Sequence, residues 1–352
     1  MKKLITMAVM ATLAGSVQAS EFLDNNAPLV RANTYLGLAY AGERAVAVGD
    51  RGKIIYSDDQ GSHWKVAATP TQVLLTAVCF ADPRHGWAVG HDAVVLGTDD
   101  GGETWTLEYS DPLGGEGDQQ DDTAYDDSGD MGDIYGDPYG DDSYDEPAPV
   151  DTSGAPLLDV YCEGRDRAVA VGGYGYFLET QDGGQNWKKD LKRLDNVDGW
   201  HLYSYNGKAG LDERYVTGEK GVIFRSRDRG KTWKKLDSPY QGTLFGATLL
   251  SDYQALVYGL QGNVWLTGNR GNSWTHIDTG LSRGINAGTV LKDGTVVLVT
   301  NAGGILTSHD GGQSLSLRFL PGRESISAVL PRSQGGVLIA GQGGVRVVED
   351  VK

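Results

Sequence analysis

Short runs of alternating apolar and polar residues, separated by glycine-rich turns, extend over most of the chain. The first complete set of runs covers residues 35–40, 45–48, 53–56 and 64–67. An apolar period of two between turn residues predicts β-strands, and no segment has the spacing of a long amphipathic helix. Four strands in roughly 40 residues match one blade of a β-propeller.

One turn sequence, Ser/Thr-x-Asp-x-Gly-x-x-Trp, recurs six times, beginning at residues 57, 98, 180, 226, 267 and 308. The Asp can accept hydrogen bonds from backbone N–H groups two residues on, the Gly supplies a positive φ, and the Trp buries its ring against a neighbouring unit. The fifth copy has Asn for Asp, and the sixth has Leu315 for Trp. The pattern resembles the Asp-box. The residues expected to form the boxes are Asp59, Trp64, Asp100, Trp105, Asp182, Trp187, Asp228, Trp233, Asn269, Trp274 and Asp310.

A second turn, Gly-x-x-Gly or a variant of it, begins eight residues before each box. A seventh copy, Gly341 to Gly344, lies near the C-terminus with no box after it. The repeats therefore predict an all-β, seven-bladed propeller, formed as a single domain by residues 20–352. The last unit has runs for only three strands, so we expect the stretch around residues 27–32 to supply its fourth strand and close the ring.

Residues 1–19 have the features of a secretory signal peptide. A basic start precedes an apolar run over residues 4–17, and a small-residue cleavage site stands before Ser20. The run is too short for the usual membrane span, so we expect cleavage and a periplasmic or secreted mature protein. We expect no other segment to span a membrane.

The sequence contains two cysteines, Cys79 and Cys162, near the ends of the first strands of consecutive blades. Export permits a disulfide. Neighbouring first strands diverge around the axis, however, and a disulfide needs closely spaced Cα atoms. A Cys79–Cys162 disulfide and two buried thiols are therefore both left open.

Residues 111–153 interrupt the repeats between the second and third blades. They contain 15 Asp or Glu and account for almost all of the formal net charge of −16. Such a composition cannot bury a core and is expected to be disordered when free. Whether the segment binds Ca²⁺ weakly, folds onto the basic third and fourth blades, or remains a solvated loop is left open. The acids considered for Ca²⁺ are Asp126, Asp127, Asp130 and Asp133.

Alternate turns of a four-stranded meander lie on opposite faces of the ring. We call the face with the boxes the box face and the face with the Gly-x-x-Gly turns the turn face. The connections between blades, including the acidic segment, also lie on the turn face. Its side chains differ from blade to blade on a repeated frame, so we expect this face to bind a partner. The candidate residues are Asp50, Arg51, His91, Asp92, Tyr174, Glu219, Lys220, Gln261, Asn301 and Gln342.

The sequence carries few signs of catalysis. It has no His-Glu-x-x-His and no Gly-x-Ser-x-Gly. We therefore expect a protein that is not an enzyme and holds no cofactor or metal. A glycoside hydrolase that pairs two acids from distant blades stays open, whereas the acidity and the expected export disfavour a nucleic-acid partner.

The repeats resemble the photosystem II assembly and stability factor family and its homologues in non-photosynthetic bacteria. The resemblance covers about residues 35–350 and rests on stretches such as Ala45 to Ser57 and Gly86 to Gly90. It implies a single, non-catalytic propeller that binds membrane-protein subunits during their assembly, and we expect a monomer. Nothing in the sequence points to photosynthesis. The expected partner is therefore another membrane-protein complex of the envelope, with a resistance-nodulation-division (RND) type transporter as the first candidate. The alternative is a carbohydrate-binding or glycoside-hydrolysing Asp-box propeller.

Overall fold

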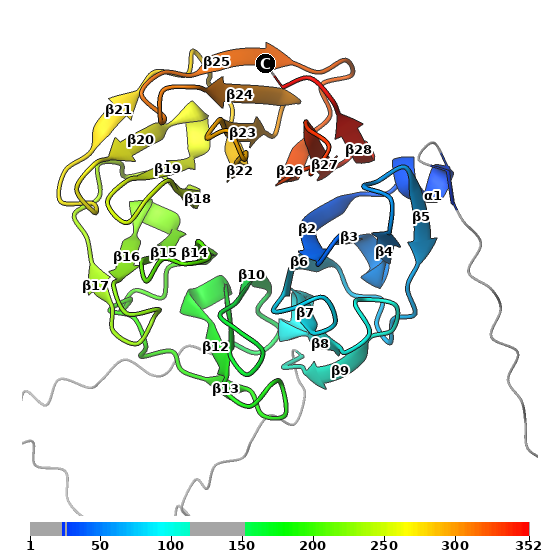
Figure 1. Ribbon diagram of the computed structural model, residues 1–352. Coiled ribbons are helices and arrows are strands. Elements are labelled where there is room, and N and C mark those ends of the chain that lie inside the picture. The colour runs from blue at the N-terminus through cyan, green and yellow to red at the C-terminus, as the bar shows by residue number, and fades with distance from the viewer. Residues whose placement is uncertain (1–22, 25–26, 113–151, 352) are drawn as a thin grey trace, which may run out of the picture.

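The computed structural model describes residues 23–24, 27–112 and 152–351, which form a ring of seven small antiparallel sheets (Figure 1). The sheets follow one another around the ring in chain order. The predicted all-β, seven-bladed propeller is confirmed. The predicted signal peptide, residues 1–19, and most of the acidic segment, residues 113–151, lie outside the described residues.

The strands of each blade follow one another from the axis outward. Blade one comprises β2 (Tyr35–Ala41), β3 (Arg44–Gly49), β4 (Ile54–Ser57) and β5 (His63–Val66). Blade two comprises β6 (Leu75–Phe80), β7 (Gly86–Gly90), β8 (Val95–Thr98) and β9 (Thr106–Tyr109). Blade three comprises β10 (Leu157–Cys162), β11 (Ala168–Gly172), β12 (Phe177–Thr180) and β13 (Lys188–Lys189). Blade four comprises β14 (Leu202–Gly207), β15 (Arg214–Gly218), β16 (Ile223–Ser226) and β17 (Lys234–Lys235).

The remaining blades repeat the arrangement. Blade five comprises β18 (Leu244–Leu249), β19 (Ala255–Gly259), β20 (Val264–Thr267) and β21 (Thr275–Ile277). Blade six comprises β22 (Ile285–Val290), β23 (Val296–Thr300), β24 (Gly304–Ser308) and β25 (Ser316–Phe319). Blade seven comprises β26 (Ile326–Pro331), β27 (Val337–Gly341) and β28 (Gly344–Val348).

The hydrophobic core is divided into seven layers, each between two neighbouring blades. In β3, Val46 and Val48 pack toward blade two, whereas Ala45 and Ala47 pack toward blade seven. Both faces of a blade are thus covered, which is why the second strands are continuous apolar runs in the sequence. A blade has no core of its own and depends on both neighbours.

The Asp-boxes are held by a repeated set of hydrogen bonds. In the first box, Ser57 Oγ accepts from the Gly61 N–H at 2.9 Å, and Asp59 Oδ1 accepts from the His63 N–H at 2.8 Å. The carboxylate therefore reaches an amide four residues on, not two as expected. Positive φ values at Gln60 and Gly61 turn the chain back over the carboxylate.

The two altered boxes keep the same turn. Asn269 Oδ1 accepts from the Ser273 N–H at 2.9 Å, and Asp310 Oδ1 accepts from the Ser314 N–H at 3.0 Å in the copy that ends in Leu315. The turn therefore needs a side-chain oxygen, but neither its negative charge nor the Trp ring.

The described ends of the acidic segment lie on the turn face between blades two and three, as predicted. The Asp111 N–H donates to the Asp92 carbonyl at 2.9 Å. The Asp111 carboxylate accepts from Lys189 Nζ and from the Tyr176 hydroxyl, each at 2.9 Å. Asp111, the first residue of the acidic segment, is therefore bonded to blade three.

The predicted strand at residues 27–32 is wrong. Pro28–Arg31 form a short helix, α1, which lies at the seam between β28 and β5 in Figure 1. Pro28 cannot donate a ladder hydrogen bond, and its fixed φ suits a first helical turn. The preceding β1 (Leu23–Asp24) pairs with β5 and extends blade one, so among the described residues blade seven has three strands.

Among the described residues, packing and hydrogen bonds close the ring, and no strand is shared across the seam. Val30 of α1 is fully buried, in the layer that also holds Trp64 and Val345. Arg332 Nε donates to the Gln60 carbonyl at 3.2 Å, and the Gln60 side-chain oxygen accepts from the Ser333 N–H at 3.2 Å. These contacts join the first box directly to blade seven.

Arginines make the same kind of contact at other seams. Arg44 of blade one donates to the Gly101 carbonyl in the second box at 3.3 Å. Arg193 of blade three donates to the Gly230 carbonyl in the fourth box at 3.1 Å. A box is therefore also an acceptor for the side chain of the preceding blade.

A disulfide joins Cys79 and Cys162, whose Cα atoms are 5.7 Å apart. The two residues lie at the box-face ends of β6 and β10, the innermost strands of neighbouring blades. Blades are closest to one another near the axis, so the divergence that would oppose such a bond is small there.

Gln60→Ala should weaken the seam between blades seven and one. Gln60 is buried, and its side chain also donates to the Glu43 carbonyl at 3.2 Å. The substitution removes two hydrogen bonds, each worth about 0.5–1.5 kcal/mol, and should lower the free energy of unfolding by about 1–3 kcal/mol. Urea unfolding measures the difference. Gln185→Ala, at an exposed position of the third box, is the control, and equal effects of the two substitutions would contradict the account.

Candidate partner-binding face

The turn face is built from one tight turn that recurs in blades one to five, with related turns in blades six and seven. The first Gly of the turn allows a close approach: a Cβ on Gly49 would lie 2.1 Å from the Thr34 carbonyl oxygen. That carbonyl accepts from the Asp50 N–H at 3.0 Å. The last Gly, Gly52, has a φ of 66°. This geometry explains the spacing of the two glycines in the repeat.

The third position of the turn is strained in five blades. The residues there have φ values between 51° and 57°, in the left-handed region that side chains other than glycine rarely adopt. They are Arg51, Asp92, Tyr174, Lys220 and Gln261. All except the half-buried Asp92 are exposed.

The other predicted residues divide into two groups. His91, Asn301 and Gln342 are exposed on the same face. Asp50 and Glu219 are half-buried, and each accepts from a backbone N–H of its own blade, that of Thr34 at 3.3 Å and that of His201 at 3.1 Å. The two acids therefore help to hold the turns.

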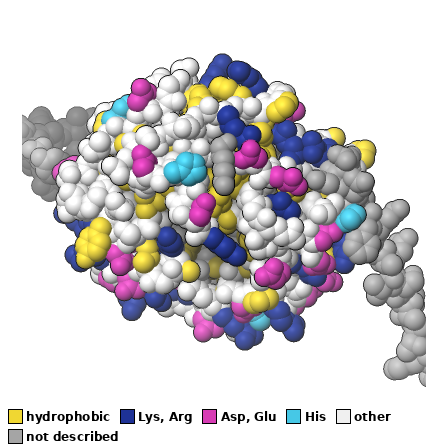
Figure 2. Space-filling model, turned by 45° about the horizontal axis from the view of Figure 1, so that its top comes forward, with side chains coloured by type: hydrophobic (Ala, Val, Ile, Leu, Met, Phe, Trp, Pro, Cys, Tyr) yellow, Lys and Arg dark blue, Asp and Glu magenta, His cyan; other side chains and the backbone are white. Residues whose placement is uncertain are grey.

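Apolar and aromatic side chains of the turn face gather on blades three to five. The Tyr174 ring lies against His201 with ring centroids 4.8 Å apart, and Lys220 Nζ lies 5.6 Å from the ring centroid of Trp200. Leu260, in the corresponding turn of blade five, is also exposed. In contrast, the turns of blades one and two are charged. Figure 2 shows one face of the molecule, on which basic and acidic side chains alternate with small apolar patches.

Sequence reasoning missed a ring of residues at the mouth of the central channel. Each innermost strand has an irregularity in its pairing after its first residue, where one extra residue forms a bulge. A bulge re-aims a side chain, and all seven bulged residues line the channel. The sequence signal is their position 13 to 15 residues before the first residue of the turn. The ring comprises Leu36, Thr76, Leu158, Tyr203, Phe245, Asn286 and Ser327.

The channel has a volume of about 510 Å³ and is lined by the innermost strands of all seven blades. Among the described residues that line it, Asp159 is the one carboxylate, and there is no Lys or Arg. Asp159 accepts from the N–H groups of Val160 and Tyr205, each at 2.9 Å. Burial raises the pKa of Asp159 to about 7, although these hydrogen bonds oppose the shift. A retaining or inverting glycosidase uses two carboxyl groups, and this wall offers one.

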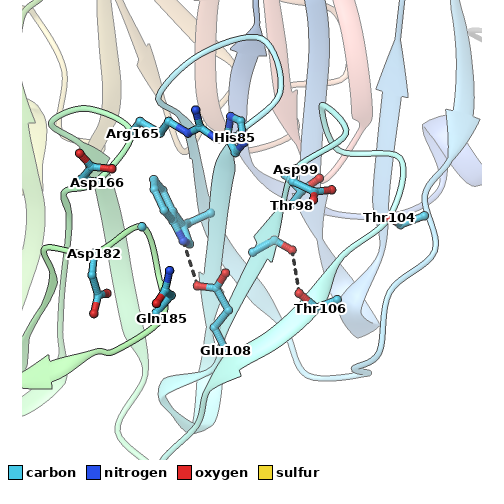
Figure 3. A pocket seen from close by; sticks show the side chains of 13 residues that line it. His85, Thr98, Asp99, Thr104, Thr106, Glu108, Arg165, Asp166, Asp182 and Gln185 are labelled. Atoms are coloured by element: carbon cyan, nitrogen blue, oxygen red, sulfur yellow. Dashed lines mark hydrogen bonds between the residues drawn. The ribbon is translucent and has the colours of Figure 1, made fainter.

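A second cavity, of about 600 Å³, opens on the box face between blades two and three (Figure 3). Its wall includes the acids Asp99, Asp166, Asp182 and Glu108, together with Arg165 and His85. Two of the acids are already engaged. Asp182 accepts from the Asn186 N–H of its own box at 2.9 Å, and Glu108 joins two blades.

Glu108 Oε2 accepts from two indoles, Trp87 Nε1 at 2.9 Å and Trp187 Nε1 at 3.0 Å. In three other boxes the Trp instead donates to a carbonyl of its own box, as Trp64 does to Gly61. Gly97 makes the space for the carboxylate, because a Cβ there would lie 1.8 Å from Glu108 Oε1. Part of the cavity wall is therefore explained by the contact that Glu108 makes between blades two and three. No group of three or more His, Cys, Asp or Glu in the described part of the chain is placed to hold a metal.

Glu108→Ala should destabilise the seam between blades two and three. It leaves two indole N–H groups without their acceptor, at a cost of about 2 kcal/mol in the free energy of unfolding. Glu108→Gln should keep both bonds, because both indoles donate to a single oxygen. Urea unfolding at neutral pH separates the two variants.

The stability of Glu108→Gln relative to wild type should rise with pH. Burial raises the pKa of Glu108, outweighing the two indole hydrogen bonds. The folded state therefore holds the proton more tightly than the unfolded state, and wild-type stability falls as the pH rises through the raised pKa. Glu108→Gln does not titrate, so it should gain stability relative to wild type above that pH. A Gln variant as unstable as the Ala variant at neutral pH would contradict this role.

A protein-family model matches most of the chain. The model is described as "Photosynthesis system II assembly factor YCF48" and matches residues 57–139 and 140–320. The chain is 26% identical over 173 residues to the Photosystem II assembly lipoprotein Ycf48 of Synechococcus sp. (strain CC9902), covering 49% of this chain and 40% of that protein. It is 40% identical over 80 residues to the chloroplastic Photosystem II stability/assembly factor HCF136 of Oryza sativa subsp. japonica, covering 23% of this chain and 18% of that protein. The chain thus matches less than half the length of these curated relatives.

Solved structures share the fold. The structure titled "YCF48 bound to D1 peptide" has a TM-score of 0.66 at 18% identity and covers 96% of this chain and 99% of its own. A GH74 xyloglucanase from Xanthomonas campestris has a TM-score of 0.63 at 14% identity and covers 95% of this chain and 54% of its own. At such identities the likeness shows the fold alone. Because the family model matches well over half of the sequence, however, the chain belongs to the family described as photosynthesis system II assembly factor YCF48.

Proposed function

We propose that this chain is a non-catalytic scaffold that binds a membrane-protein complex of the cell envelope through its turn face. It would act as an assembly, stability or accessory factor for that complex. Membership of a family of assembly factors supports a scaffold role. One solved relative is titled as bound to a D1 peptide, which is a precedent for peptide binding by this fold. An RND-type transporter is the first complex to test.

The observation that carries the proposal is the strained third position of the turns. Glycine would adopt a φ of 51° to 57° without strain, yet five blades carry a side chain there. Each such residue costs of order 1 kcal/mol. Strain of this kind gathers at functional sites, and four of the five side chains, two cations, a tyrosine and a glutamine, are exposed to solvent. A rigid ring that displays different groups at equal intervals suits recognition of a large surface.

Export is part of the proposal. The leader over residues 1–19 supports it. The Cys79–Cys162 disulfide also supports it, because structural disulfides persist in oxidising compartments. Within the described ranges, no helix has the length and apolar character needed to cross a membrane. We therefore infer that the mature chain meets its partner complex in the periplasm.

The carbohydrate alternative has less support. The xyloglucanase likeness concerns the fold alone. The described channel wall carries aromatic residues but a single carboxylate, so it lacks the acid pair that glycoside hydrolysis uses. The scaffold is therefore the better interpretation of the same geometry.

Capture of the tagged mature protein from crosslinked native envelopes, read by mass spectrometry, tests the proposal. We expect recovery of one membrane-protein complex. The double variant Arg51→Glu and Lys220→Glu should reduce that recovery by roughly tenfold or more, because it reverses two exposed charges on the turn face.

Lys231→Glu is the matched control. Lys231 is an exposed cation of the fourth box, on the opposite face of the same blade as Lys220. The control should capture the complex as wild type does. Equal losses in both variants would refute binding through the turn face. Capture of no protein, together with binding to a polysaccharide array, would refute the scaffold and favour the carbohydrate alternative.

A further inference from the structure

Asp159 is the one charged side chain among the described residues that line the channel, and it has no cation beside it. The carboxylates of Glu163, Glu179 and Glu213 are also largely buried, and each forms an ion pair with an arginine at 2.6 to 2.8 Å. Asp159 accepts two backbone N–H groups, and no Lys or Arg lies along the described channel wall. Charged groups inside proteins are usually paired, so the channel lacks the counter-charge that these three glutamates receive.

The position of Asp159 places this charge just inside the turn-face mouth of the channel. It follows Leu158, the bulged residue of blade three, and is the third residue of β10 (Leu157–Cys162). Because a strand advances about 3.3 Å per residue, Asp159 lies one residue below the rim. The disulfide at Cys162 marks the other end of the same strand, toward the box face.

The rim above Asp159 is apolar on one side. Leu158, Tyr203 and Phe245 are the bulged residues of blades three, four and five, and all are half-buried. The Tyr203 and Phe245 rings make an edge contact at 5.2 Å. These three lie inward of Tyr174 and His201 on the same side of the ring, so an apolar surface leads into the channel.

Two polar members of the rim are already engaged in hydrogen bonds. Thr76 donates to the Leu157 carbonyl at 2.7 Å, and Asn286 donates to the Ile326 carbonyl at 2.8 Å. Both bonds run to the next blade. The polar side of the rim therefore holds the ring together, and the apolar side is left to receive a ligand.

Basic side chains predominate near the box-face mouth of the channel. Lys208, Lys292 and Arg332, with Glu43 as the one acid, line a cavity formed by the box-face turns between the first and second strands. A positively charged ligand would be repelled there and attracted at the turn face.

From this geometry we infer that the turn-face mouth of the channel binds a cationic side chain, lysine or arginine, of a partner polypeptide. The cation enters the channel and pairs with Asp159, and an apolar residue next to it in the partner packs on Leu158, Tyr203 and Phe245. The inference rests on the proposed scaffold function and names the chemistry of the partner segment. Burial raises the pKa of Asp159 to about 7, which agrees with a carboxylate that lacks a compensating charge.

Two end-blocked tripeptides test the inference on the purified mature protein: acetyl-Leu-Phe-Lys-amide and its Gln counterpart, acetyl-Leu-Phe-Gln-amide. They differ in charge but present the same apolar residues. Calorimetry should give the Lys peptide an affinity about tenfold higher than that of the Gln peptide. High salt should reduce the difference.

Variants assign the effect to its residues. Asp159→Asn should abolish the preference for Lys, whereas Asp99→Asn, which removes a carboxylate from the box-face cavity, should leave it unchanged. Phe245→Ala should weaken both peptides and keep the preference. If Asp159→Asn does not fold, the affinities of the two peptides for wild-type protein, and their salt dependence, still test the inference.

Equal affinities of the two peptides for wild type would overturn the inference, as would a Lys preference that survives Asp159→Asn. The envelope capture separates this failure from failure of the scaffold. If wild type captures a complex but shows no Lys preference, the scaffold stands and only the channel site is refuted. If wild type captures no complex, the scaffold itself fails, whatever the peptides do.

Discussion

No blade of this propeller can bury its own faces, and the rest of the structure depends on that constraint. Each apolar layer is shared by two neighbours, so the seven sheets are stable only as a ring. The polar contacts follow the same rule. Arginines reach the box of the next blade, Glu108 takes indole N–H groups from two blades, and Gln60 connects the last blade to the first. The turns at the two faces are fixed by this frame and can carry different side chains.

Much of this architecture is written in the sequence as repeats. Boxes such as that ending in Trp64 and turns such as Gly49 to Gly52 are determined by residues close together in the sequence. The number and order of the turns, and the face of the ring on which each kind lies, could therefore be predicted. The turns also tolerate loss of one element. Asn269 keeps the box turn without a charge, and the box that ends in Leu315 keeps it without the indole.

The features that the sequence analysis missed or left open depend on contacts between distant segments. Pro28 begins a helix because Val30 finds an apolar layer at the ring seam, which no local pattern reveals. The Cys79–Cys162 disulfide depends on how closely neighbouring blades approach at the axis. The bulged residues, such as Tyr203, interrupt the pairing of a strand without interrupting its composition, so alternation alone does not reveal which side chains line the channel.

The two faces differ in how far their side chains are engaged in contacts within the fold. Side chains of the box face are largely engaged in holding turns and neighbouring blades. The turn face combines exposed, strained positions with a channel mouth whose acid has no partner cation. A scaffold needs exposed side chains that do not already stabilise its own fold, and the turn face has such side chains.

The most direct test of this account is a footprint of the protein in its native envelope, measured by hydrogen–deuterium exchange or covalent labelling with and without the membrane complex present. We predict protection of the Gly-x-x-Gly turns, such as residues 50–52 and 219–221, with the boxes unchanged. Protection of the boxes with exposed Gly-x-x-Gly turns would contradict the central claim that the turn face binds the partner.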